Sequence, residues 1–223
     1  MEAWESLPAP PRRTGLRNVL GAMVVWAWIP AIVLPGASLM AGHLLTLPKP
    51  SDADPVMGAA IASARPPSSE GRFFALHVLL GSCTCSQRIL THLVDRGPRR
   101  DLDERVVVVD PEDAAPAERA RAAGFDVESI TRAELFARYK IEAAPLLVVA
   151  SPAGKVAYVG GYTDRKQSLA VRDVDLESRL VRGEHVEPLP TFGCAVSTGL
   201  QRRVDPLGVR YLERRPCRAS RVI

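Results

Sequence analysis

A long uncharged stretch near the N-terminus most constrains what this chain can fold into. No Asp, Glu, Lys or Arg occurs from Asn18 to Pro48, and about 20 consecutive apolar residues are enough to span a bilayer. Pro30 and Pro35 lie inside the stretch, which transmembrane helices tolerate. The sequence therefore predicts a transmembrane anchor at residues 18–46.

Basic residues flank this stretch unequally. Arg12, Arg13 and Arg17 precede it, and the next basic residue is Lys49. Because positive charge is retained in the cytoplasm, we expect a single-pass protein with residues 1–17 in the cytoplasm and the remainder in the periplasm or outside the cell. A cleaved signal peptide is the alternative, with a candidate cleavage site in residues 37–42.

Residues 47–71 are rich in Pro, Ser and Ala. Five prolines punctuate them, at positions 48, 50, 55, 66 and 67. Such a composition is typical of a linker, so we expect this segment to connect the anchor to a domain.

Helical and strand-like patterns alternate after residue 72. Strands are predicted at residues 73–80, 105–110, 146–150 and 155–159, with a short element at 125–130. Helices are predicted at residues 86–96, 114–123 and 167–182, and a capping box at 131–134 starts another. Alternation favours parallel pairing early in the chain, and the tight turn at 151–154 favours an antiparallel hairpin late. The prediction is an α/β domain at residues 72–183, followed by an extension at 184–223 with a Gly-Cys motif and a basic tail.

Two cysteines mark the junction of the first predicted strand and helix. Cys83 and Cys85 follow the apolar run 73–80 and precede the amphipathic stretch. The N-terminus of a helix stabilises anions, which lowers the pKa of a thiol located there. Cys194 and Cys217 are the other two cysteines. On the predicted outer side of the membrane, thiols are able to persist as disulfides.

The arrangement around Cys83 resembles the thioredoxin-like superfamily, particularly its membrane-anchored and secreted redoxins. The matching features are Cys83 itself, residues 139–149 with Pro145, the turn at 151–156, and Gly160-Gly161. Residues 183–194 are similar to redoxins that keep a Gly-Cys after the last helix. The resemblance implies a mixed sheet flanked by helices, and thiol–disulfide oxidoreductase activity on protein dithiols, protein disulfides or a membrane redox partner.

The resemblance also implies roles for individual residues. Cys83 would attack a substrate disulfide and Cys85 would resolve the mixed disulfide. A cis Pro145 would shape the docking groove and leave the backbone of Ala144 free to pair with an extended substrate. Cys194 is a candidate resolving or third thiol. The expected supporting residues are Ser82, Thr84 and Ser86, with Ser82 and Ser86 donating hydrogen bonds to the thiolate.

The spacing of the cysteines departs from the family's Cys-x-x-Cys. Ser86 occupies the usual resolving position, and a disulfide closed over the single residue Thr84 would be strained and easily reduced. No cofactor is expected for an oxidoreductase. The alternatives are a copper-binding protein with Cys83, Cys85 and Cys194 as ligands, and a non-catalytic interaction domain. His77 is predicted to be a buried, hydrogen-bonded residue, and no nucleic-acid partner is expected.

Overall fold

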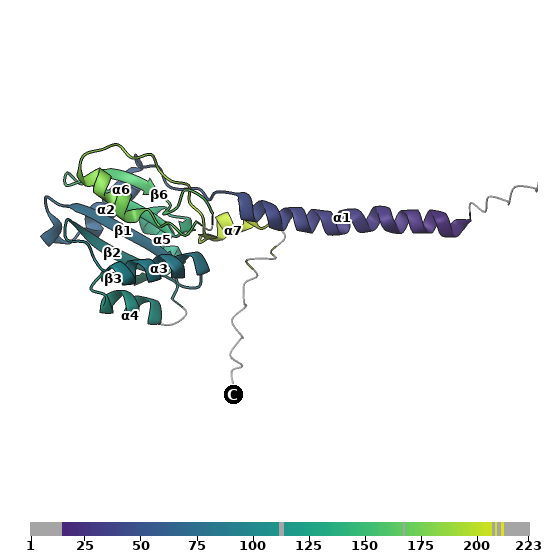
Figure 1. Cartoon of the computed structure of the whole chain (residues 1–223), viewed down its shortest axis with the longest axis horizontal. Helices are drawn as coiled ribbons and strands as arrows, with labels where there is room; N and C mark the ends of the chain where they lie inside the picture. The colour runs from purple at the N-terminus through teal and green to yellow at the C-terminus, as the bar shows by residue number, and fades with distance from the viewer. Residues whose placement is uncertain (1–14, 112–113, 167, 207, 209–210, 212–223) are drawn as a thin grey trace, which may run out of the picture. The chain divides into compact units, whose positions relative to one another are not determined.

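The computed structural model describes residues 15–111, 114–166, 168–206, 208 and 211, and the chain divides into two compact units, Met1–His43 and Leu44–Ile223. The first unit contains helix α1 (Leu16–Leu44), shown in Figure 1. Among the described residues, α1 is the one helix long and apolar enough to cross a membrane, a test that a signal sequence near the N-terminus also passes. The predicted apolar helix is confirmed to that extent, and its anchoring and orientation stay predictions.

The second unit is built on a five-stranded mixed sheet in the order β3-β2-β1-β5-β6. Strand β1 (Phe73–Leu80) lies parallel to β2 (Leu102–Val109), which is parallel to β3 (Asp126–Ile130). On its other side β1 pairs antiparallel with β5 (Leu146–Ala150), and β5 continues as a hairpin with β6 (Val156–Gly160). Parallel pairing early and an antiparallel hairpin late are as predicted, so the α/β fold class is confirmed.

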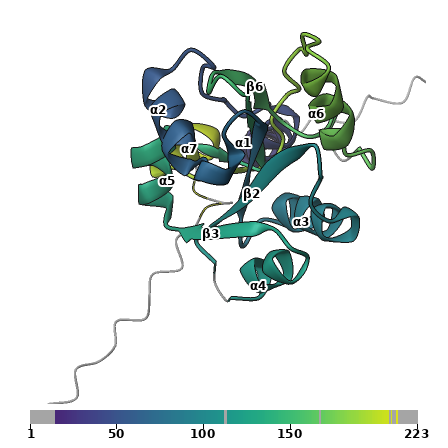
Figure 2. The ribbon, with the colours of Figure 1, turned by 90° about the vertical axis from the view of Figure 1, so that its left-hand side faces the viewer.

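Helices cover both faces of the sheet (Figure 2). Helices α3 (Thr84–Arg96), α4 (Ala115–Ala122) and α6 (Asp173–Val181) lie on one face. Helices α2 (Pro55–Ala64) and α5 (Arg132–Tyr139) lie on the other. A 3₁₀ turn, η1 (Pro67–Ser69), leads into β1. Burying both faces of the central strand explains why β1 and β5 are almost continuously apolar.

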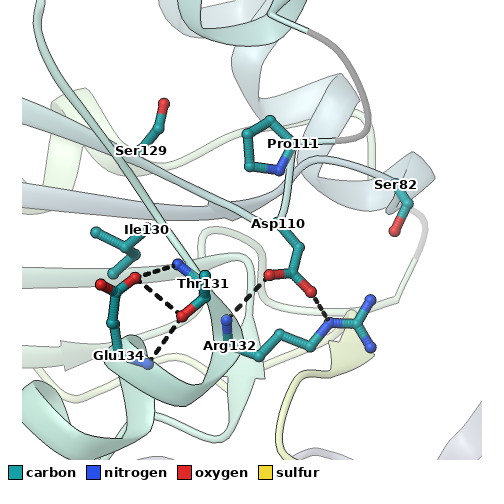
Figure 3. Close-up of a pocket in the computed structure, with 8 residues that line it drawn as sticks. All are labelled: Ser82, Asp110, Pro111, Ser129, Ile130, Thr131, Arg132 and Glu134. Atoms are coloured by element: carbon teal, nitrogen blue, oxygen red, sulfur yellow. Dashed lines mark hydrogen bonds and ion pairs between the residues drawn. The ribbon is translucent and has the colours of Figure 1, made fainter.

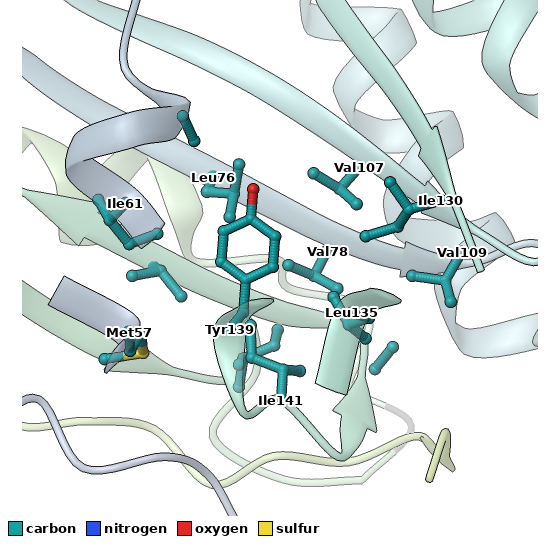
Figure 4. Close-up of a cluster of buried hydrophobic side chains, with 14 of the residues drawn as sticks. Met57, Ile61, Leu76, Val78, Val107, Val109, Ile130, Leu135, Tyr139 and Ile141 are labelled. Atoms are coloured by element: carbon teal, nitrogen blue, oxygen red, sulfur yellow. The ribbon is translucent and has the colours of Figure 1, made fainter. Parts of the chain in front are cut away.

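The core is accordingly divided by the sheet. Figure 4 shows the cluster around Tyr139, in which Met57 and Ile61 of α2 pack with Leu76 and Val78 of β1. The second cluster joins the apolar stripe of α3 to the opposite face of the sheet. Each fully buried large side chain contributes about 1.5–3 kcal/mol. The two clusters pack around the C-terminal end of β1 and the N-terminal end of α3, and they thereby position Cys83 and Cys85.

The segment predicted as a linker is partly a helix of the core, which corrects that prediction over residues 55–64. The carboxylate of Asp54 accepts hydrogen bonds from the amides of Val56 and Met57, and proline at the first helical position suits a helix start. Met57, Ile61 and Ala64 are buried. Their spacing of four and three residues forms one helical stripe, which composition alone conceals.

The predicted helix at residues 167–182 is shorter than expected, because α6 begins only at Asp173. The amide of Arg172 donates to the carbonyl of Tyr162, and Arg88 donates to the carbonyl of Ser168. These long-range contacts hold the backbone before α6 in a loop. The predicted capping box at the start of α5 is confirmed, with Thr131 and Glu134 bonding reciprocally.

A second, two-stranded sheet completes the unit. Strand β4 (Ala143–Ala144) pairs antiparallel with β7 (Cys194–Ala195), and helix α7 (Thr198–Val204) follows. Residues 184–204, predicted as an extension, therefore include a strand and a helix that belong to the folded unit.

Candidate functional site

Cys83 lies at the strand-to-helix junction where the sequence places it. It is the N-cap residue of α3, with extended backbone angles of φ −95° and ψ 120°. Its amide donates to the carbonyl of Leu80 at 3.1 Å, and its own carbonyl accepts the first bond of the helix from Gln87 at 2.9 Å. The side chain is buried, with 2% of its surface exposed.

The sulfur of Cys83 is surrounded by hydrogen-bond donors. The thiols of Cys194 and Cys85 bond to it, and so do the backbone amides of Ser86 and Cys85. Burial disfavours the thiolate, but these donors outweigh it, so the pKa of Cys83 lies well below its ordinary value. A thiol in this environment ionises readily, and the thiolate is the nucleophilic form. The structure thus brings three of the four cysteines together, with no disulfide among these three.

Cys194 reaches Cys83 through β-pairing. In the β4–β7 pair, Cys194 lies directly opposite Ala144. Opposed residues in an antiparallel pair project their side chains to the same side. Ala144 and Cys83 belong to one buried cluster, and Cys194 packs against it. The peptide bond between Ala144 and Pro145 is cis, as predicted.

This pairing corrects the expectation that the backbone of Ala144 is free to receive a substrate strand. Gly193 lies so close to β4 that a Cβ atom on it would be 2.0 Å from the carbonyl oxygen of Ala144 and 2.6 Å from Cδ of Pro145. A Cβ on Gly161 would likewise be 2.1 Å from the carbonyl oxygen of Pro190. The chain's own C-terminal segment therefore lies where a docking groove beside Pro145 is predicted.

The predicted supporting residues have different surroundings. The hydroxyl of Ser86 accepts from the amide of Leu80 at 3.0 Å, and it is the backbone amide of Ser86 that donates to the sulfur of Cys83. Ser86 is thus a donor through its backbone, which corrects the predicted hydroxyl contact. Ser82 and Thr84 are exposed beside Cys83. Cys217 and the basic tail lie outside the described residues.

An open cavity of about 550 Å³ is lined in part by Ser82, the residue before Cys83. Figure 3 shows that it lies at the carboxyl ends of β2 and β3, with the Arg132–Asp110 ion pair between Ser82 and Glu134. Asp110 has a positive φ of 41° and accepts a second bond from the amide of Arg132. The cavity gives the surface next to Cys83 a polar, charged wall.

A separate polar network is buried beneath α3 and α6. His77 bonds through Nε2 to Glu104 at 3.0 Å and through Nδ1 to the hydroxyl of Tyr162 at 2.9 Å, as predicted for a buried histidine. Arg96 bonds to Glu104 and, at 2.9 Å, to Asp173. Burial opposes ionisation of Glu104, but hydrogen bonds from His77 and Arg96 outweigh it and lower its pKa to about 2.

Glu177 is the exception within this network. It is completely buried, and neither carboxylate oxygen has a hydrogen-bond partner. Burial and the neighbouring carboxylates Glu104 and Asp173 raise its pKa well above the ordinary value. His77, Glu104 and Glu177 place ligand atoms within 4.8 Å of one another, a spacing compatible with a metal ion. However, Arg96 already supplies the positive charge at Glu104.

Sequence reasoning missed this network, because its members are distant in the chain. His77 was the one visible signal, a polar residue inside an apolar strand. Glu104, Arg96 and Glu177 each fit an ordinary exposed position on a strand or a helix. Only their convergence beneath α3 and α6 identifies them.

Comparisons with known proteins give a similarity of fold. No protein-family model and no curated protein matches the chain. Solved structures that match include an uncharacterised conserved protein from Geobacillus kaustophilus, at 15% identity and a TM-score of 0.45, covering 58% of this chain and 78% of that one. Two other matching structures are of proteins named as oxidoreductases.

One is the thioredoxin domain of a thiol-disulfide oxidoreductase from Bacteroides vulgatus, at 11% identity and a TM-score of 0.33, covering 40% of this chain and 69% of that one. The other is a secreted disulfide oxidoreductase of Mycobacterium tuberculosis, homologous to DsbE of E. coli. It matches at 14% identity and a TM-score of 0.34, covering 52% of this chain and 84% of that one.

Proposed function

We propose that this protein is a membrane-tethered thiol–disulfide oxidoreductase that acts outside the cytoplasm through Cys83. The observation that carries the proposal is the surroundings of one sulfur atom. Cys83 caps α3, and its sulfur accepts hydrogen bonds from two thiols and two backbone amides. Stabilising the thiolate is what an attacking cysteine requires.

The proposed reaction is exchange between thiols and a disulfide. The Cys83 thiolate attacks one sulfur of a partner disulfide, forming a mixed disulfide and expelling the other partner sulfur as a thiolate that takes up a proton. A neighbouring thiol of this protein then attacks Cys83 and expels the second partner sulfur. The partner gains two electrons and two protons, and this protein becomes a disulfide. The reverse sequence oxidises a partner dithiol.

The proposed location follows from α1 and the arginines before it. An uncleaved apolar helix would hold the domain at the membrane surface, with the thiols on the oxidising side. A protease-protection assay on spheroplasts, whose inner membrane is intact, tests this. Tagged C-terminal domain that resists external protease in intact spheroplasts would contradict it.

Activity is tested with the full chain in detergent. Reduction of an insulin-type protein disulfide is measured for the native chain, Cys83→Ser and, as a control, Cys217→Ser. We expect activity to be lost in Cys83→Ser and kept in Cys217→Ser, which removes a thiol that the proposed reaction does not use. Full activity of Cys83→Ser would overturn the proposed function.

The same cluster favours a second candidate, binding of a soft metal such as Cu(I). Three convergent thiols, Cys83, Cys85 and Cys194, are the ligand type that Cu(I) prefers. Copper stoichiometry of the reduced chain separates the two functions. A stoichiometry of one tightly bound copper ion per chain, abolished by each of the three Cys→Ser substitutions, would favour the metal site.

A further inference from the structure

The third thiol of the cluster arrives on a strand that fills the groove beside Pro145. We propose that the segment around Gly193-Cys194 acts as an internal substrate of the site and that Cys194, rather than Cys85, is the thiol that resolves intermediates on Cys83. This inference rests on the proposed function and assigns its second catalytic residue.

The position of Cys194 is fixed from both sides. The carbonyl of Leu189 accepts from the amide of Gly161 at 3.0 Å. On the other side, the amide of Val196 donates to the carbonyl of Glu142 at 2.6 Å, and the hydroxyl of Ser197 donates to the carboxylate of Glu142 at 2.6 Å. These bonds hold β7 against β4, so Cys194 is presented to Cys83 in the way that an extended substrate would present its own cysteine.

Cys85 is less suited to the role. Its thiol bonds to the sulfur of Cys83, but it lies only two residues after Cys83, within the first turn of α3. A disulfide closed over the single residue Thr84 departs from the preferred geometry. A bridge between Cys83 and Cys194 instead joins two elements that already lie in contact.

The resolving step balances as follows. After Cys83 has formed a mixed disulfide with a partner protein, the thiolate of Cys194 attacks the sulfur of Cys83. The bond between Cys83 and the partner breaks, and the partner sulfur leaves and takes up a proton. The product is the Cys83–Cys194 disulfide, and the partner disulfide is the oxidant that accepts the two electrons.

Peptide mapping tests the connectivity. The reduced full chain in detergent is oxidised with glutathione disulfide, blocked with N-ethylmaleimide and digested with trypsin. Cleavage after arginine places Cys83 and Cys85 together in residues 73–88 and Cys194 in residues 183–202. We expect these two peptides to be disulfide-linked, with the maleimide on Cys85. A loop within residues 73–88 and a maleimide on Cys194 would overturn the proposal, as would a Cys85–Cys194 link.

Turnover tests the catalytic role separately. With a protein disulfide as substrate, Cys194→Ser should trap the mixed disulfide and slow turnover by at least about tenfold, whereas Cys85→Ser should turn over without trapping it. Trapping in Cys85→Ser and not in Cys194→Ser would reject Cys194 as the resolving thiol. Cys83 would remain the attacking residue in that case, whereas activity in Cys83→Ser would reject the function itself. Circular dichroism of each variant confirms that it folds.

Discussion

The sheet separates two polar clusters that are built on opposite principles. The thiol cluster around Cys83 is made of three cysteines, two of them partly exposed, and its bonds lower the pKa of Cys83. The network around Glu104 is buried, dense in charge and held by a histidine and an arginine. A partly accessible cluster of thiols is open to reaction, whereas a buried ionic network is suited to fixing helices in place. The difference supports the proposal that the first cluster reacts and the second stabilises the fold.

The largest expected effect breaks the ionic network. Arg96→Met removes the guanidinium that pairs with the buried carboxylates of Glu104 and Asp173. Removing one partner of a buried ion pair costs about 3–5 kcal/mol, so the free energy of unfolding of the full chain in detergent should fall by that amount. The measurement is denaturant unfolding.

Arg165→Met is the matched control for this experiment. The Arg165 side chain is 83% exposed, and its ion pair with Asp164 spans 4.0 Å. An exposed pair of this kind contributes about 0–1 kcal/mol. Equal effects of the two substitutions would contradict a structural role for the network.

The next effect concerns the strand that carries Cys194. Gly193→Ala would place a Cβ atom 2.0 Å from the carbonyl oxygen of Ala144. Overpacking costs about 1–3 kcal/mol, and we expect β7 to shift away and Cys83 to react faster with maleimide. Gly199→Ala is the control, because its Cβ would approach nothing closer than 4.0 Å. Unchanged labelling in Gly193→Ala would show that β7 does not cover Cys83.

A smaller, pH-dependent effect is expected at Glu177. The pKa of Glu177 is higher in the folded chain than in the unfolded chain. As pH rises, the unfolded chain therefore releases the carboxyl proton of Glu177 before the folded chain does. The stability of the fold falls as pH rises from the unfolded pKa toward the folded pKa. Glu177→Gln removes that loss and should stabilise the protein at pH 8, because a neutral amide replaces a buried carboxylate that has no hydrogen-bond partner. The gain should shrink toward pH 4.

Thermal unfolding of the two proteins across this pH range provides the measurement. Asp175→Asn, an exposed carboxylate on the same helix, should change stability by less than about 0.5 kcal/mol. A gain in Glu177→Gln that is the same at every pH would show that Glu177 does not titrate differently in the folded state.

The smallest effect probes the thiol cluster itself. Cys194→Ala removes the donor with the largest influence on the pKa of Cys83. The pKa of Cys83 should rise, so the alkylation rate of Cys83, followed by mass spectrometry, should increase at a higher pH than in the native chain. Cys194→Ser keeps a hydroxyl donor and should move the profile less. A profile that does not move in Cys194→Ala would remove Cys194 from the environment of Cys83.

Much of the fold was predictable because its signals are local. The apolar runs of β1 and β5, the capping box at Thr131 and the stop at Gly97 each depend on neighbours in sequence. Helix α2 was missed for a related reason. Its core-facing stripe of three residues is short, and the surrounding prolines dominate the composition.

The sequence by itself determined that Cys83 lies where a buried strand turns into a helix and that Pro145 precedes a strand of the same sheet. Both follow from short-range backbone preferences. Tertiary structure alone decided which groups surround that sulfur. Pairing of β4 with β7 brings in Cys194 from more than a hundred residues away and closes the groove at Ala144. Tertiary structure alone also decided the network of Glu104, Arg96 and Glu177. A buried charge is stable only where it is paired, and here the partners come from elements that are distant in the sequence.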